Sequence, residues 1–181
     1  MISIGIYLAE HGLIPDRLLR LFIRQFSLSR LVEANNEDQK KSVIEGLKIG
    51  PIAENTIDAN EQHYEVPAEY FKAVLGPRLK YSCCWFDDQS TTLGEAEIKM
   101  MESYIERAKI EDGQTILDLG CGWGSLSLFL AERFPNSAIY SVSNSNDQIE
   151  HIKHIAKEKN LENLHPEVQD VNSLTLNQQF D

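Results

Sequence analysis

The feature that most constrains the fold of this chain is a glycine-rich segment that directly follows a short apolar run. Residues 116–119 (Ile-Leu-Asp-Leu) have the length and composition of a buried strand, and the glycines at 120, 122 and 124 follow at once. Apolar residues then recur at helical spacing, at Leu126, Phe129, Leu130 and Phe134. A strand, a glycine turn and a helix in this order build a nucleotide-type ligand site at the carboxyl end of a parallel sheet. Glycine is needed there because a Cβ would hold the backbone away from the ligand.

The sequence after this segment predicts half of a doubly wound α/β fold. Residues 138–142 read as a second buried strand, and residues 167–171 as a third, with Pro166 limiting pairing at its start. Capping-box patterns at 92–95 and 145–148 mark the starts of two helices. From residue 115 onward the predicted order is therefore strand, helix, strand, helix, strand. The parallel sheet is incomplete at the C-terminus, because a fourth strand would be expected at 180–181.

The first third of the chain predicts a helical region. Pro15 can open a helix, and Leu18, Phe22 and Phe26 then recur at helical spacing with arginines between them. This helix either packs on the domain with its arginines in water, or it contacts a membrane surface or a partner helix. Residues 33–48 predict a helix or a mobile link, and residues 60–81 predict short helices and turns.

Composition excludes several classes of function. The 181 residues are 42% hydrophobic and 25% charged, as in a soluble globular protein. The net charge of −11 argues against a general nucleic-acid binder. Three cysteines, at 83, 84 and 121, form no disulfide framework and no zinc-binding pattern. Without a membrane-spanning stretch or a signal-peptide pattern, we expect a cytoplasmic location and no metal site.

Several longer motifs then carry a family resemblance. The segment His63-Tyr64-Glu65-Val66-Pro67, the run at 79–84 (Leu-Lys-Tyr-Ser-Cys-Cys) and the run at 117–126 occur in this order. Together they resemble the cyclopropane-fatty-acid-synthase-like methyltransferases, which include the coclaurine N-methyltransferase type. The G-x-G-x-G spacing at 120–124 also differs from the G-x-G-x-x-G of nicotinamide enzymes. The resemblance implies a class I (Rossmann-like) methyltransferase fold with S-adenosylmethionine as its cofactor.

The resemblance implies contacts with the amino-acid end of that cofactor. Tyr81 and Ser82 would lie over its methionine part, although Tyr81 could also be an ordinary core aromatic. Gly120 and Gly122 would line the amino-acid end. Asp118 would steady the glycine loop or the amino group of the cofactor.

It also implies contacts with the nucleoside end. Asn144 and Gln148 would take the place of the acid that usually binds the ribose hydroxyls. Asp170 would contact the adenine edge, with Val171 beside the ring. Two of these residues have simpler readings: Gln148 could be the second half of a capping box, and Asp170 an ordinary turn residue.

The domain organisation follows from the same resemblance. Residues 1–90 are expected to form a helical N-terminal extension and a segment that covers the cofactor. Residues 91–181 are expected to form the first half of the cofactor-binding domain.

The implied reaction is methyl transfer to a small-molecule amine by in-line displacement. The amine needs a base, which in the coclaurine-type enzymes lies in a Glu-x-x-Glu-His segment that this sequence does not contain. We therefore assign no catalytic residue and expect no turnover by this chain alone. Two alternatives stay open: transfer to lipid acyl chains, favoured by the basic helix at 15–26, and a cofactor-binding fragment or subunit without catalysis. An open sheet edge also favours homo-oligomers.

Overall fold

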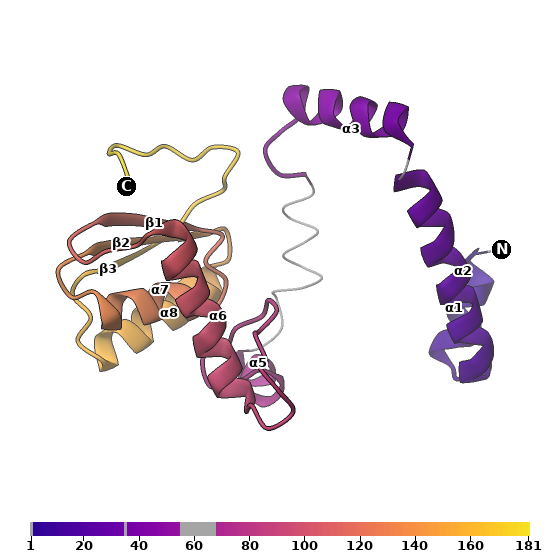
Figure 1. Cartoon of the computed structure of the whole chain (residues 1–181), viewed down its shortest axis with the longest axis horizontal. Helices are drawn as coiled ribbons and strands as arrows, with labels where there is room; N and C mark the ends of the chain where they lie inside the picture. The colour runs from indigo at the N-terminus through magenta and orange to yellow at the C-terminus, as the bar shows by residue number, and fades with distance from the viewer. Residues whose placement is uncertain (1, 35, 55–67) are drawn as a thin grey trace. The chain divides into compact units, whose positions relative to one another are not determined.

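The computed structural model describes residues 2–34, 36–54 and 68–181, and it contains two compact units, Met1–Ile52 and Ala53–Asp181 (Figure 1). The motif at 63–67 lies outside the described residues. None of the described helices is long and apolar enough to cross a lipid bilayer.

The first unit consists of the helices α1 (Ile2–Glu10), α2 (Asp16–Ala34) and α3 (Glu37–Ile49). Helix α2 begins directly after Pro15, whose carbonyl accepts the first hydrogen bonds of the helix. It continues to Ala34, well past the predicted segment 15–26. Asn36 caps α3, because its Oδ1 accepts the backbone N–H of Asp38 at 3.0 Å. Most of the polar segment 33–48 is therefore helical, and α3 contacts α2.

The second unit contains the predicted alternation of strands and helices. Two helices come first, α5 (Ala68–Val74) and α6 (Leu93–Ala108), and the predicted capping box between Thr92 and Glu95 is formed. The sheet and its crossover helices follow as β1 (Thr115–Leu119), α7 (Ser125–Arg133), β2 (Ala138–Ser143), α8 (Asn146–Glu158) and β3 (Leu164–Val168). All three strands are parallel, in the order β1-β2-β3. The predicted α/β class and parallel sheet are therefore confirmed.

Helices α7 and α8 cover one face of the sheet, and Figure 1 shows them side by side beneath it. The centre of the core between these layers is aliphatic, and its fully buried members are Leu130, Ile139, Ile149 and Ile152. The absence of a side chain at Gly124 lets α8 approach the glycine turn closely, because a Cβ built on Gly124 would lie 2.5 Å from Cγ1 of Ile152. Burial of these side chains is the main term that stabilises the unit.

The third strand begins earlier than predicted. It spans Leu164–Val168 instead of 167–171, and it includes Pro166, which lies opposite Ser141 of β2. In a parallel sheet, every second backbone N–H of a strand points toward the same neighbouring strand. Gln169 donates its N–H to the carbonyl of Ser143 in β2, and Pro166 lies three residues before it. The nitrogen of Pro166 therefore points away from β2, so proline removes no bond between these strands.

The other face of the sheet is lined by the C-terminal segment. The ring of Tyr140 lies between those of His165 and Phe180, at centroid distances of 4.8 and 5.6 Å. Asp181 donates its N–H to the carbonyl of Thr115 at 3.0 Å. The chain thus returns to the edge of β1 that does not pair with β2, where a fourth strand was expected.

The two compact units divide at residue 52, whereas the sequence was divided at residue 90. Hydrogen bonds explain the difference, because Arg78 and Lys80 donate their backbone N–H groups to Glu97 of α6. The segment 76–82 is thereby tied to the unit that contains the sheet. The predicted division at residue 90, with a segment of 1–90 covering a cofactor, stays a prediction.

Candidate functional site

The glycine turn between β1 and α7 is fastened to the end of the neighbouring strand. The backbone N–H groups of Gly120 and Cys121 both donate to the carbonyl of Val142, at 2.8 and 3.0 Å. Gly120, Gly122 and Gly124 all have positive φ angles, of 79°, 54° and 80°, which side chains with a Cβ rarely adopt. A Cβ built on Gly120 or Gly122 would meet no atom within 4 Å. These two glycines therefore border open space, and their missing side chains leave room for a ligand.

Two adjacent cavities open at this turn. The first, of about 320 Å³, lies at the carboxyl ends of the three strands and is lined by Ala53, Leu119, Gly120, Gly122, Val142, Ser143, Asn144, Gln148, Gln169, Asp170 and Val171. The second, of about 290 Å³, lies between the turn and the segment 79–82 and is lined by Leu79, Lys80, Tyr81, Ser82, Tyr104, Asp118, Gly120, Cys121, Gly122, Trp123, Ser125, Leu126 and Gln148. Every site residue predicted from the sequence lines one or both of them.

Asp118 lines the second cavity from the end of β1. Ser127 of α7 donates its hydroxyl to Oδ2 of Asp118 at 2.5 Å. Burial raises the pKa of Asp118, and the hydrogen bonds from Ser127 oppose that shift. This carboxyl group links the first turn of α7 to β1 and lines the second cavity at the same time.

Gln148 does not complete the predicted capping box. Ser145 caps α8, because its Oγ accepts the N–H of Gln148, but the backbone N–H of Ser145 is taken by Oγ of Ser143. The hydroxyl of Ser143 then donates to Oε1 of Gln148 at 2.8 Å. The capping-box prediction at 145–148 is therefore only half right, since the second half of the box is replaced by a contact within the β2–α8 turn.

The amide nitrogen of Gln148 is left without a partner. The residue is only 3% exposed, and its Nε2 makes no hydrogen bond to any residue that the structure describes. A buried amide in this state costs free energy unless a ligand or water accepts from it. Because Gln148 lines both cavities, this donor is suited to an oxygen of a bound molecule.

A turn after β3 forms the far wall of the first cavity. Oδ1 of Asp170 accepts the backbone N–H of Asn172 at 2.8 Å, and the side chain of Asn172 binds both backbone groups of Ala53. The amide of Asn172 thus joins residue 53 to the site across a long stretch of sequence. Asp170 is therefore a turn residue, and it also lines the first cavity.

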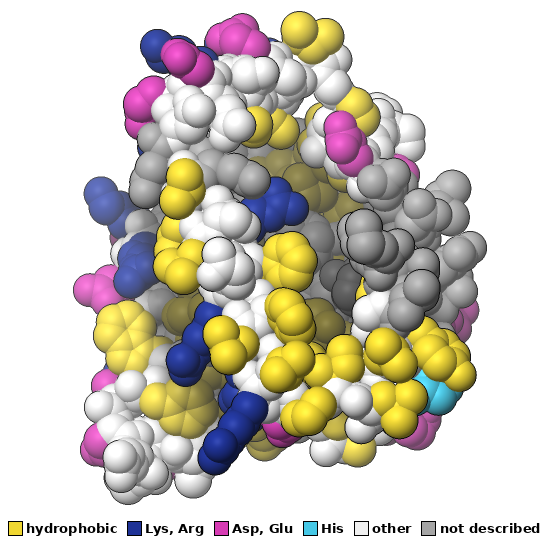
Figure 2. Space-filling model, turned by 90° about the vertical axis from the view of Figure 1, so that its right-hand side faces the viewer, with side chains coloured by type: hydrophobic (Ala, Val, Ile, Leu, Met, Phe, Trp, Pro, Cys, Tyr) yellow, Lys and Arg dark blue, Asp and Glu magenta, His cyan; other side chains and the backbone are white. Residues whose placement is uncertain are grey.

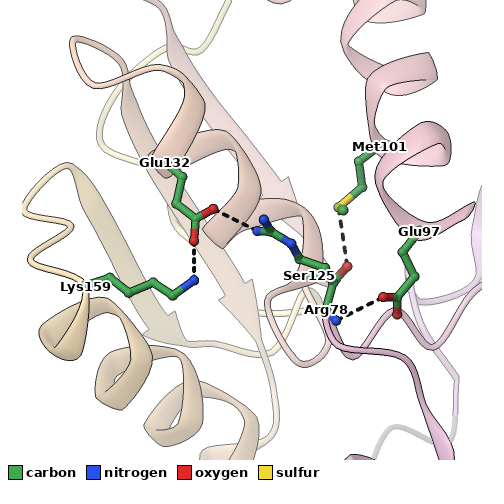
Figure 3. A network of polar contacts seen from close by, with 6 residues as sticks. All are labelled: Arg78, Glu97, Met101, Ser125, Glu132 and Lys159. Atoms are coloured by element: carbon green, nitrogen blue, oxygen red, sulfur yellow. Dashed lines mark hydrogen bonds and ion pairs between the residues drawn. The ribbon is translucent and has the colours of Figure 1, made fainter. Parts of the chain in front are cut away.

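The segment 76–82 forms the wall of the second cavity and is anchored by a buried carboxylate. Glu97 of α6 is fully buried, and one of its oxygens accepts the backbone N–H of Arg78 at 3.0 Å (Figure 3). The other oxygen accepts the backbone N–H of Lys80 at 3.1 Å. Ser82 accepts a hydrogen bond from Lys80. Tyr81 is 55% exposed, so it is not a core aromatic, and its ring contacts Phe71 edge-on at 5.8 Å.

Burial disfavours the reactive thiolate form of two cysteines, Cys84 and Cys121. Burial raises the pKa of Cys121 to about 12, and the charge of Asp118 adds to that shift. Burial also raises the pKa of Cys84. Thiols of this kind stay protonated and unreactive near neutral pH. No cluster of three metal-ligating side chains occurs in the described ranges.

Sequence reasoning missed three residues that shape the site. Lys80 lies within the motif that contains Tyr81 and Ser82, so its neighbours could have drawn attention to it. Nothing in the sequence distinguishes Glu97 from the other glutamates of α6, which are not buried. The contact between Asn172 and Ala53 depends on the tertiary fold alone.

A three-member ion-pair network joins the cavity wall to the helices behind it. Glu132 of α7 accepts from Arg78 Nη1 at 2.8 Å and from Nζ of Lys159, which follows α8 (Figure 3). The pKa of Glu132 is lowered: burial alone would raise it, but the hydrogen bonds and charges of Lys159 and Arg78 outweigh burial. A lowered carboxyl pKa stabilises the fold above the ordinary value of 4.5, and this contribution is lost as the pH falls through the folded-state pKa.

Replacing this carboxylate should therefore have a pH-dependent effect. We expect Glu132→Gln to lower the free energy of unfolding by about 1 kcal/mol near pH 7, measured by urea denaturation. The deficit should shrink as the pH falls below 4.5. Glu158→Gln is the matched control, since its exposed carboxylate pairs with His154 at 3.4 Å and should change stability little. A deficit that is the same at every pH would contradict this assignment.

Comparison with known proteins identifies relatives of this arrangement. The family profile of mycolic acid cyclopropane synthetase matches residues 53–181. The (S)-coclaurine N-methyltransferase of Thalictrum flavum subsp. glaucum is 37% identical over 179 residues, which covers 95% of this chain and 49% of that protein. The chain therefore spans about half the length of the curated relatives that it matches.

Two solved structures resemble the fold. A coclaurine N-methyltransferase bound to N-methylheliamine and SAH superposes with a TM-score of 0.88 and 34% identity, over 99% of this chain and 54% of that one. A mycolic acid cyclopropane synthase complexed with SAH and CTAB gives a TM-score of 0.56 and 26% identity, over 65% of this chain and 40% of that one.

Proposed function

We propose a function from one premise: this chain belongs to the mycolic acid cyclopropane synthetase family, whose profile covers residues 53–181. The chain binds S-adenosylmethionine in the two cavities beside the glycine turn and serves methyl transfer to a small-molecule amine. One observation carries the proposal. The open glycine cradle and the unpartnered amide of Gln148 meet at the carboxyl end of a parallel sheet.

The residues at the cavities fit the parts of this cofactor. When bound, it supplies a methyl group on a positively charged sulfur. Asp118 offers a carboxylate to the amino group, and Ser82 and Tyr81 close the amino-acid end of the second cavity. Gly120 and Gly122 let the backbone approach the ligand closely.

The first cavity suits the nucleoside part. The unpartnered Nε2 of Gln148 can donate to a ribose hydroxyl, and Asn144 lines the same wall. Asp170 and Val171 line the same cavity, and we assign them to the edge and the ring of the adenine. Two cavities that share Gly120, Gly122 and Gln148 thus match a long ligand with chemically different ends.

The amine acceptor is supported by the coclaurine-type relatives, whose similarity covers nearly all of this chain. The contribution of the chain to the reaction is alignment of the cofactor and exclusion of water. A reducing compartment such as the cytoplasm suits its three free cysteines.

The cofactor site can be tested without turnover. We expect calorimetric titration with SAH to show binding to the wild-type chain, and Gly122→Val to weaken it by at least about tenfold, or ~1.4 kcal/mol. Gly113→Val is the matched control: Gly113 also has a positive φ, a Cβ there would meet nothing within 4 Å, and it lines neither cavity described above. Gly122→Ala replaces the valine variant if that one unfolds. Equal losses of SAH affinity in the variants at 113 and 122 would refute the proposal that Gly122 borders the bound cofactor.

We assign no catalytic base, and we expect no methyl transfer by this chain alone. Asp118 is buried and bonded to Ser127, and Asp170 holds the turn at Asn172, so both carboxyl groups lining the cavities have structural partners. Labelled cofactor with a panel of amines, and with lipid vesicles in parallel, measures transfer in a sample that binds SAH. Label in either acceptor would contradict this expectation and would identify the acceptor class.

We also propose that α2 contacts an anionic membrane surface. Arg17, Arg20 and Arg24 share one side of the helix, and Phe22 and Phe26 are 54% and 72% exposed. Figure 2 shows hydrophobic side chains close to Lys and Arg side chains on the side of the molecule that faces the viewer. Basic and apolar groups together favour binding at an anionic interface.

Vesicle sedimentation tests this contact. The chain should sediment with phosphatidylserine vesicles, and replacing Arg17, Arg20 and Arg24 by glutamate should abolish it. Replacing Lys40, Lys41 and Lys48 of α3 by glutamate makes the same change in charge and should reduce sedimentation less. Self-association is the competing use of this face, and a stable dimer in light scattering without vesicles would count against the membrane contact.

A further inference from the structure

Lys80 is a buried cation in the wall of the second cavity. It is only 6% exposed, and its Nζ donates to Oγ of Ser82 at 2.5 Å, to the carbonyl of Cys83 at 2.8 Å and to the hydroxyl of Tyr104 at 3.1 Å. The ammonium group also lies 5.1 Å from the centre of the Tyr104 ring. Its three hydrogen bonds are thus all made to neutral groups.

No carboxylate within the described ranges forms an ion pair with this ammonium group. The nearby carboxylate of Glu97 is used differently, because its oxygens accept the backbone N–H groups of Arg78 and Lys80. The buried carboxylate of Glu97 offsets part of the charge of Lys80 without a direct ion pair, and a buried ammonium group still favours an anion in the space beside it. The second cavity is the open space that such an anion can enter.

Ser82 connects the cation to that space. Its oxygen accepts from Lys80, so the hydroxyl hydrogen of Ser82 remains available to an acceptor. A serine that is polarised by an ammonium group is a stronger donor than an isolated one. Asp118 lines the same cavity with its carboxyl group. The cavity therefore offers a cationic side chain at one wall and a carboxyl group that can accept a hydrogen bond at another, which suits the two polar groups of an amino acid.

We propose that Lys80 is a positioning residue that acts through Ser82 to hold the carboxylate of the cofactor's amino-acid end. This inference rests on the proposed function, since S-adenosylmethionine carries one carboxylate and that group is its only anion. Lys80 supplies the countercharge and fixes the Ser82 hydroxyl, and the ammonium group of the cofactor faces Asp118.

Two ligands separate this role from a structural one. SAH carries the carboxylate, whereas 5′-methylthioadenosine lacks the whole amino-acid end. We expect Lys80→Met to weaken SAH binding by about tenfold to a hundredfold, and to leave 5′-methylthioadenosine binding within about twofold. Lys80→Gln, which keeps a donor without the charge, should show the same selectivity.

Controls make each outcome decisive. Lys99→Met removes the charge of a partly exposed lysine of α6 that pairs with Asp87 and lines neither cavity, and it should change neither affinity by more than about threefold. The Lys80→Met and Ser82→Ala effects on SAH should not add, because the lysine acts through the serine. Equal losses for both ligands, or unfolding of both Lys80 variants in circular dichroism, would assign Lys80 to the fold and overturn the inference. Failure of the wild-type chain to bind either ligand would instead reject the proposed function.

Discussion

The carbonyl of Val142 is the acceptor on which the site depends, because the N–H groups of Gly120 and Cys121 both bind to it. This pair of bonds holds the glycine turn against the end of β2, so the ligand side of the turn is defined by the sheet. Gly124 adds the second constraint, since the close approach of Ile152 leaves no room for a Cβ. With the turn held from both sides, one wall of each cavity is fixed, and the segments 79–82 and 169–171 supply other walls.

The parts of the fold that were predictable are those whose signal is local. The strand at 115–119, its glycine turn and the capping box at Thr92 were read correctly because neighbouring residues determine them. The third strand was misplaced because Pro166 was judged by its missing donor, and only the register shows that this donor would point away from β2. The hydrogen-bond partner of the Gln148 side chain could not be predicted either, because Ser143 bonds to it in place of the backbone N–H at the helix cap.

The two units of the chain relate differently to known families. The cyclopropane synthetase profile begins at residue 53, where the second compact unit also begins, and the cavities are lined by residues of that unit alone. The helices of the first unit lie outside the profile but inside the region similar to the coclaurine N-methyltransferase, which covers 95% of this chain. The proposed cofactor site therefore belongs to the second unit alone.

Chemical shift mapping with SAH tests the central claim most directly. On ¹⁵N-labelled chain, we predict that SAH shifts the backbone amides of Gly120, Gly122, Asn144 and Asp170 together with the side-chain amide of Gln148. The amides of α2 and α3 should stay unchanged, and 5′-methylthioadenosine should shift the nucleoside end of the same set. Shifts confined to α2 and α3, or an unchanged spectrum at millimolar SAH, would contradict the account of the glycine turn as the cofactor site.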